Sequence, residues 1–215
     1  MTVHPTSSFE EILHHIVGDD ALHCRWVNTL SMMENIGARK ITASEHPLKV
    51  TETVLKHAAE ETRHAYYLKR QIKKITPDTC PSFEPEFLLN GRKSANYMQR
   101  LDSRICKRLR LENGLEGYEL KYAAYVLVTY AVEIRADYIY NRYQEILTTL
   151  KSPISVRGIL AEEEQHLAEM EAMIDQCFIH DGDKWRQIAQ ETEESLYQDW
   201  LSGFIAALSP LKKVA

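Results

Sequence analysis

The chain has 215 residues, of which 44% are hydrophobic and 27% are charged, with only 8 glycines and 7 prolines. This composition is typical of one helix-rich domain and argues against a low-complexity chain. The net charge of -5 argues neither for a general nucleic-acid binder nor for an acidic tail protein. The four separated cysteines form no Cys-x-x-Cys pair for a zinc or rubredoxin-like iron site. We expect a single cytoplasmic domain over residues 1–215, with its thiols reduced.

Helix signals follow one another along the first half of the chain. A short helix is predicted over residues 8–17, and the acidic residues there argue against a signal peptide. Asp20 is predicted to cap a second, longer helix through residue 40. A third helix is predicted over residues 51–74. Three prolines make the next segment, residues 76–92, irregular.

The second half of the chain is predicted to contain four more helices. A basic helix covers about residues 94–111, and the longest helix covers about residues 117–150. Ser152 and Pro153 look like the cap and first position of the next helix, which ends near residue 178. A last helix covers residues 184–208.

These elements predict an all-α fold. Four helices are long, and the irregular segment between the second and third lets two antiparallel pairs assemble into one bundle. No segment alternates in the manner of a strand. The most apolar run, residues 122–132, is too short to cross a bilayer. We expect it to be a buried helix segment and expect no membrane association.

A Glu-x-x-His pattern occurs three times, at residues 11–14, 61–64 and 163–166. The first copy lies in the short N-terminal helix, where chance placement explains it. The other two lie deep inside long helices, and each is preceded by a further glutamate. Because residues three apart on a helix point in nearly the same direction, each pair can bind one ligand.

The remaining two long helices each carry a carboxylate in their central turns. Glu133 directly follows the apolar run, and a lone buried carboxylate is costly unless it is paired or binds a metal. Glu34 is the central acidic residue of the other helix. Mixed carboxylate and imidazole donors suit Fe(II) or Mn(II). The predicted metal ligands are Glu34, Glu61, His64, Glu133, Glu163 and His166.

This order of ligands, over about residues 20–178, resembles the ferritin-like di-iron carboxylate superfamily. That superfamily includes bacterioferritins, rubrerythrins, ribonucleotide reductase small subunits, acyl-carrier desaturases and aldehyde-deformylating oxygenases. The resemblance implies a ferritin-like four-helix bundle with an added crossover helix and an added C-terminal helix. It implies two iron ions per chain, or one manganese and one iron. It also implies that Glu61 and Glu163 bridge the ions, that Glu34 and Glu133 are terminal ligands, and that each histidine binds one ion.

Two further glutamates stand one position before the motif glutamates. A histidine that binds a metal usually donates its other ring N–H to a carboxylate. We therefore expect Glu60 to support His166 and Glu162 to support His64 across the bundle. The alternative is that both are solvated charges at a helix edge.

Three other polar residues lie near Glu133 or the 61–64 motif. Asp137, one turn after Glu133, is predicted to hydrogen-bond a ligand, with a surface salt bridge as the alternative. His57 is expected to be structural. Tyr130 is the candidate redox tyrosine, with core packing as the alternative, and Tyr140 lies two turns from Glu133 on the same stripe.

The basic helix contains seven Lys or Arg residues between positions 92 and 110. Its outer face is either an ordinary solvated surface or a dock for an acidic partner, such as an acyl carrier, an electron-transfer protein or a nucleic acid.

Three reactions are compatible with such a metal site. The first is O2 activation to oxidise an organic substrate, which we favour because the added helices can build a substrate cavity. This reaction is compatible with an electron donor protein as a partner and with a homodimer. The second is iron oxidation for storage, and the third is peroxide reduction, although a rubrerythrin carries a Cys-x-x-Cys iron domain that this chain lacks. The non-enzyme alternative is a helical interaction module that binds no metal.

Overall fold

The computed structural model describes residues 8–208, and within that range it contains seven α-helices, one short 3-10 helix and no strand. The all-α prediction is confirmed. The elements are α1 (Phe9–Val17), α2 (Asp20–Ser44), α3 (Glu52–Ile75), η1 (Pro85–Phe87), α4 (Gly91–Asn113), α5 (Gly117–Thr149), α6 (Arg157–Cys177) and α7 (Gly182–Leu208). Across residues 8–208, none of the helices has the length and apolarity needed to span a membrane.

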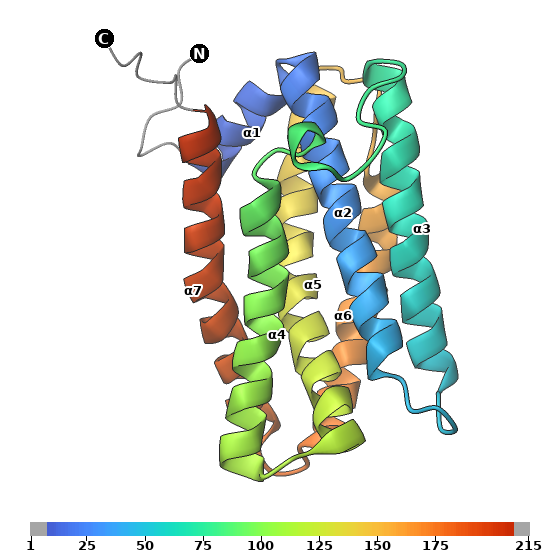
Figure 1. Cartoon of the computed structure of the whole chain (residues 1–215), viewed down its shortest axis with the longest axis vertical. Helices are drawn as coiled ribbons and strands as arrows, with labels where there is room; N and C mark the ends of the chain where they lie inside the picture. The colour runs from blue at the N-terminus through green and yellow to red at the C-terminus, as the bar shows by residue number, and fades with distance from the viewer. Residues whose placement is uncertain (1–7, 209–215) are drawn as a thin grey trace.

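Helices α2 to α7 run side by side along the long axis of the molecule, and α1 crosses one end (Figure 1). Helix α2 packs most extensively on α3, and α5 packs on α6; α4 and α7 pack on α5 and on each other. The segment that joins α3 to α4 crosses α2 at one end (Figure 1). The side chain of Asn28 holds it there by donating to the carbonyls of Ser82 and Phe87, at 2.8 Å each.

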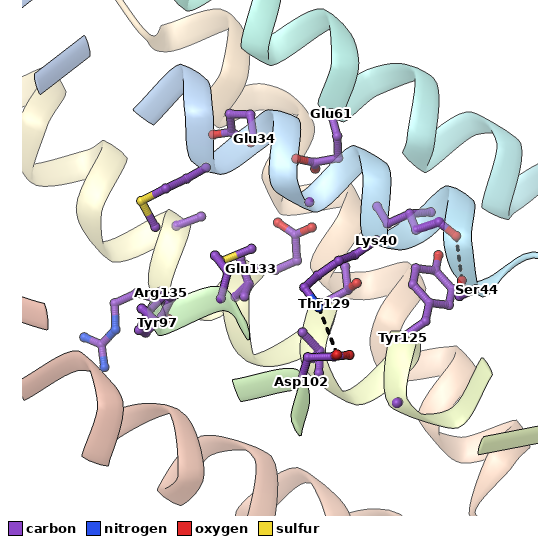
Figure 2. Close-up of a pocket in the computed structure, with 18 of the residues that line it drawn as sticks. Glu34, Lys40, Ser44, Glu61, Tyr97, Asp102, Tyr125, Thr129, Glu133 and Arg135 are labelled. Atoms are coloured by element: carbon purple, nitrogen blue, oxygen red, sulfur yellow. Dashed lines mark hydrogen bonds and ion pairs between the residues drawn. The ribbon is translucent and has the colours of Figure 1, made fainter. Parts of the chain in front are cut away.

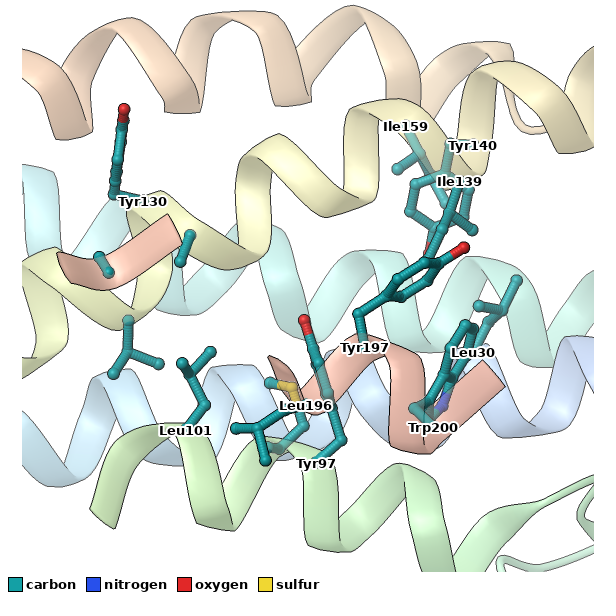
Figure 3. Packing of buried hydrophobic residues seen from close by; sticks show 14 of the residues in the cluster. Leu30, Tyr97, Leu101, Tyr130, Ile139, Tyr140, Ile159, Leu196, Tyr197 and Trp200 are labelled. Carbon is teal, nitrogen blue, oxygen red and sulfur yellow. The ribbon is translucent and has the colours of Figure 1, made fainter. Parts of the chain in front are cut away.

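Helix α7 is attached to the other helices by aromatic packing. Trp200 contacts the rings of Trp26 in α2 and Phe9 in α1, and its indole N–H donates to Oγ of Ser94 in α4 at 2.9 Å. Tyr197 and Trp200 of α7 lie beside Tyr97 of α4 (Figure 3). Burial of each large aromatic side chain contributes about 2 kcal/mol. This packing fixes α7 as a wall beside α4 and α5.

Several helix starts differ from the sequence prediction: α4 begins at Gly91 rather than at about residue 94, and α7 at Gly182 rather than at residue 184. The cap of α2 is Asp19 rather than Asp20, since the Asp19 side chain accepts from the backbone N–H of Leu22 at 3.0 Å. Helix α6 begins at Arg157 rather than at Pro153. The reason is a competing contact, because the backbone N–H of Val156 donates to the Gln144 side chain of α5 at 2.8 Å. Residues 154–156 are thereby held against α5 in a non-helical conformation.

Candidate metal centre

The six predicted ligands lie together between α2, α3, α5 and α6. Their donor atoms form two groups, and within each group all donor atoms lie within 4.8 Å of one another. One group contains Glu61, Glu133, Glu163 and His166, and the other contains Glu34, Glu61 and His64. Glu61 belongs to both groups. The arrangement therefore offers two adjacent positions for a cation, with one histidine at each.

The centre is shielded from solvent. Glu133 and Glu163 are each 3% exposed, and His64 and His166 are each 1% exposed. A buried charged or polar group is costly unless it is hydrogen-bonded, paired or bound to a metal. Such a concentration of carboxylates inside a helical core does not contribute to stability by itself, so it indicates a ligand site.

Three buried atoms of the centre have no hydrogen-bond partner among the described residues: Nδ1 of His64, Nδ1 of His166 and Oε1 of Glu163. Nδ1 of His64 lies 3.2 Å from Oε1 of Glu163, and Nδ1 of His166 lies 3.9 Å from Oε2 of the same carboxylate. Nδ1 of His166 also lies 3.5 Å from Oε1 of Glu133. These unpartnered donors converge on common points, which fits a pair of metal ions held by oxygen and nitrogen.

The opposite ring nitrogen of each histidine is hydrogen-bonded to a carboxylate from the facing helix. Nε2 of His64 lies 2.8 Å from Oε2 of Glu162, and Nε2 of His166 lies 2.8 Å from Oε2 of Glu60. Each carboxylate accepts a hydrogen bond from Nε2–H, so Nδ1 is the ring nitrogen that faces the centre and would bind a metal. Both hydrogen bonds are those expected from the sequence.

The carboxylates perturb one another's ionisation. Burial raises the pKa of Glu163 to about 8, and Glu133 adds to that rise. Burial also raises the pKa of Glu133 to about 7, although its hydrogen bond with Glu163 acts in the opposite direction. Burial and the charges of Glu34, Glu163 and Glu133 raise the pKa of Glu61 well above its usual value.

The pKa of His64 is also raised, whereas that of the outer carboxylate Glu162 is lowered. Burial alone would lower the pKa of His64, but Glu163 and Glu34 outweigh it and raise that pKa to about 9. Arg63, the strongest influence on Glu162, lowers the pKa of that carboxyl to about 2. In the metal-free centre protons therefore offset the carboxylate charge, and a bound cation would replace them.

Tyr140, rather than Tyr130, reaches the centre. The Tyr140 hydroxyl donates to Oε1 of Glu34. The hydroxyl of Tyr130 instead accepts from Nε2 of Gln190 in α7 at 2.9 Å, and Figure 3 shows it far from Tyr140 along α5. At 100° per residue, Tyr140 is offset by about 20° from Glu133 around the helix, whereas Tyr130 is offset by about 60° in the opposite sense.

Asp137 does not join the centre. It is exposed, and its carboxylate accepts from the Asn141 side chain at 2.7 Å within α5. Its offset from Glu133 is about 40° in the same sense as that of Tyr130, so both residues turn away from the ligands. Asp137 therefore lies at the surface, as the alternative of a surface salt bridge requires, but its partner is the Asn141 amide rather than a charged side chain.

His57 forms a second hydrogen-bonded chain beside the centre. Its Nδ1 lies 2.6 Å from the hydroxyl of Tyr125, and its Nε2 lies 2.7 Å from Oε2 of Glu169. Its ring also lies 4.9 Å from that of His166, centroid to centroid. His57 thus packs beside the His166 ring. Tyr125 and Glu169 were not singled out in the sequence, because no local motif connects them with His57.

A cavity of about 310 Å³ adjoins the centre. All four ligand carboxylates line it, and Figure 2 shows Glu34, Glu61 and Glu133 entering from α2, α3 and α5. Most of its remaining wall is apolar. Representative lining residues are Leu30, Met33, Ile41, Met98, Val128, Val132 and Ile139. Lys40 and Asp102, also in the wall, form an ion pair at 2.9 Å (Figure 2).

The basic helix predicted over residues 94–111 corresponds to α4, and part of its charge holds α7 in place. Lys93 and Arg100 both pair with Asp199 of α7, at 3.1 and 2.8 Å. Arg108 pairs with Glu112 of its own helix at 2.6 Å. The positive charge available on this face is therefore smaller than the sequence suggests.

No protein family, curated protein or solved structure matches this chain. The function is therefore inferred from the geometry of the centre and of the cavity beside it.

Proposed function

We propose that this protein is a di-iron carboxylate oxidoreductase that uses O2 to oxidise an organic substrate. In this proposal α2, α3, α5 and α6 form a ferritin-like four-helix bundle, while α4 and α7 enclose the substrate. The observation that carries the proposal is the juxtaposition of a buried cluster of four carboxylates and two histidines with an apolar cavity of about 310 Å³.

The donor set supports two iron ions, or one manganese and one iron. Glu61 belongs to both donor groups, and the two oxygens of Glu163 face different histidines, which suits these two residues as bridging ligands. Glu34 and Glu133 each belong to one group and suit terminal positions. Iron bound here would supply electrons to O2 and so permit oxidation of an otherwise unreactive substrate.

The protein's own residues have three tasks in this proposal. Glu60 and Glu162 keep each histidine in the orientation and tautomer that a metal requires. Tyr140 orients the Glu34 carboxylate by donating a hydrogen bond to it. The apolar wall binds the substrate beside the carboxylates and excludes water, which limits side reactions of the oxidant.

Iron oxidation for storage is the second candidate, because it requires the same ligands. The mainly apolar wall of the cavity favours oxidation of an organic molecule, since hydrated iron entering a storage shell needs a polar path. Iron loading separates the two functions: an oxygenase binds about two iron ions per chain, whereas a storage protein continues to accumulate iron after O2 is admitted.

The test is anaerobic Fe(II) addition followed by O2, with iron counting and optical spectra. We expect about two iron ions per chain and an oxidised di-iron absorption that Glu61→Ala and His166→Ala each abolish. Asp137→Ala is the matched control, because it removes an exposed carboxylate from α5 without touching the centre. Retention of the absorption in both ligand variants would refute the ligand assignment, and absence of bound iron in the wild type would support the metal-free interaction module.

A further inference from the structure

A positively charged groove lies at the surface between α3 and α6, next to the candidate metal centre. Its volume is about 500 Å³, and His64 forms part of its floor. Helix α3 contributes the exposed side chains of Arg63, Tyr66, Arg70 and Lys74. The charge of this surface is opposite to the net charge of -5 of the whole chain. The groove therefore attracts a negatively charged partner.

The cations of the groove form a long stripe rather than a compact pocket. Arg63, Arg70 and Lys74 are separated by seven and four positions, so they follow one side of α3 over about 17 Å. Lys73 and Lys74 make no ion pair with any described residue. A stripe of this length suits an extended acidic surface better than a single small anion.

An exposed aromatic side chain lies within this stripe. Tyr66 is 63% exposed, and the Arg70 guanidinium lies 5.8 Å from its ring centroid. Tyrosine and arginine are the residue types that most often dominate protein–protein binding. The groove thus combines long-range attraction with a side chain able to make a specific contact.

A chain of hydrogen bonds links the groove to the metal centre. Arg63 is 52% exposed and donates two hydrogen bonds to Glu162, at 2.9 and 2.5 Å. Glu162 in turn accepts from Nε2 of His64, at 2.8 Å. A partner that contacts Arg63 would therefore be connected to His64 through two side chains, Arg63 and Glu162.

We propose that the α3/α6 groove docks an acidic electron-carrier protein that reduces the metal centre. The inference rests on the proposed function, because oxygenation of a C–H bond by O2, with the second oxygen atom leaving as water, consumes two electrons and two protons. A one-electron carrier such as a reduced [2Fe–2S] protein supplies these electrons in two encounters. The protons come from solvent.

The α4 surface is the competing location for an acidic partner. Lys93, Arg100 and Arg108 of α4 are already paired with carboxylates, although the exposed Lys107 and Arg110 of α4, like Arg70 and Lys74 of α3, are not. Within residues 8–208, the polar contacts of His64 and His166 come from side chains outside α4. The α3/α6 groove is favoured because its Arg63 is connected to His64 through Glu162.

The first test measures binding of an acidic [2Fe–2S] ferredoxin to the metal-free protein by calorimetry. The test variant is Arg70→Glu with Lys74→Glu, and the matched control is Lys107→Glu with Arg110→Glu, which makes the same charge change on exposed α4 residues. We expect the α3 pair to weaken binding about tenfold or more at low salt and the α4 pair to change it little, with the difference shrinking as salt screens the charges. Equal loss in both pairs, loss only in the α4 pair, or no binding by the wild type would overturn the proposal.

The second test measures reduction of the oxidised iron-loaded protein by the reduced ferredoxin and by dithionite. The α3 pair should slow reduction by ferredoxin about as much as it weakens binding, and it should leave reduction by dithionite unchanged. If dithionite reduces the wild type but the α3 pair reacts with ferredoxin at the wild-type rate, the docking site is wrong and the proposed function stands. If dithionite produces no spectral change in the wild type, the redox function itself fails. Self-association of the wild type that the α3 pair abolishes would instead assign the groove to a second copy of the chain.

Discussion

Replacement of Glu61 by glutamine is expected to stabilise the metal-free protein at alkaline pH while it abolishes metal binding. Burial and three neighbouring carboxylates raise the pKa of Glu61 well above its ordinary value of 4.5. The folded state therefore retains a proton that the unfolded state releases, and the stability of the wild type falls as the pH rises above about 4.5. Glutamine has no such proton, so its advantage is absent at low pH and grows with pH.

The size of the effect follows from the spacing of the carboxylates. Glu61 has donor atoms within 4.8 Å of those of Glu34, Glu133 and Glu163. One ionised neighbour at that distance costs about 3 kcal/mol at an effective dielectric constant of about 20. For a chain of this length, such a change raises the melting temperature by about 6–12 °C.

Calorimetric melting of chelator-treated protein at about pH 4 and about pH 8 measures this directly. Asp137→Asn is the control, because its exposed carboxylate should produce no comparable dependence on pH. The reasoning is refuted if Glu61→Gln melts no higher than the wild type at the alkaline pH, or if its advantage is the same at both pH values.

Three further outcomes are expected. Glu60→Gln and Glu162→Gln should each weaken Mn(II) or Fe(II) binding about ten- to a hundredfold in a chelator competition. The control Glu164→Gln, which changes an exposed neighbour, should bind metal normally. Normal affinity in the first two variants would show that Glu60 and Glu162 do not support the metal-binding histidines. Metal affinity should fall as the pH drops below about 8 and then about 7, because protons compete for Glu163 and Glu133; a flat titration between pH values of about 6 and 8 would contradict these shifts. Val128→Phe should fill part of the cavity. Uptake of a small apolar probe such as toluene, followed by NMR, should then fall at least severalfold, while the metal content stays at two ions per chain. Unchanged uptake would show that the cavity is not the binding site.

The helices and the six candidate ligands could be predicted from the sequence because both depend on local periodicity. A 3.6-residue repeat identifies a helix and its buried side, and a Glu-x-x-His pair inside such a repeat places two donors on that side. The hydrogen bonds of Glu60 and Glu162 to the opposite histidines followed from the same repeat, together with the general need of a metal-binding histidine for a carboxylate partner.

Contacts between helices that share no motif could not be predicted. His57, Tyr125 and Glu169 come from three helices, and their contact depends on how α3, α5 and α6 are rotated relative to one another. The position of Tyr140 could have been predicted from its small angular offset from Glu133, but nearness in sequence favoured Tyr130. The late start of α6 depends on the Gln144 side chain, which competes with the helix for the Val156 backbone.

The most direct test of the central claim is anomalous diffraction from crystals of the protein loaded with Fe(II) or Mn(II). The geometry predicts two anomalous peaks per chain, one beside Nδ1 of His64 and one beside Nδ1 of His166, with Glu61 between them. Both peaks should be absent from crystals of Glu61→Ala treated in the same way. Peaks confined to the protein surface, or no peaks at all in the wild type at saturating metal, would contradict the assignment of this cluster as a di-metal centre.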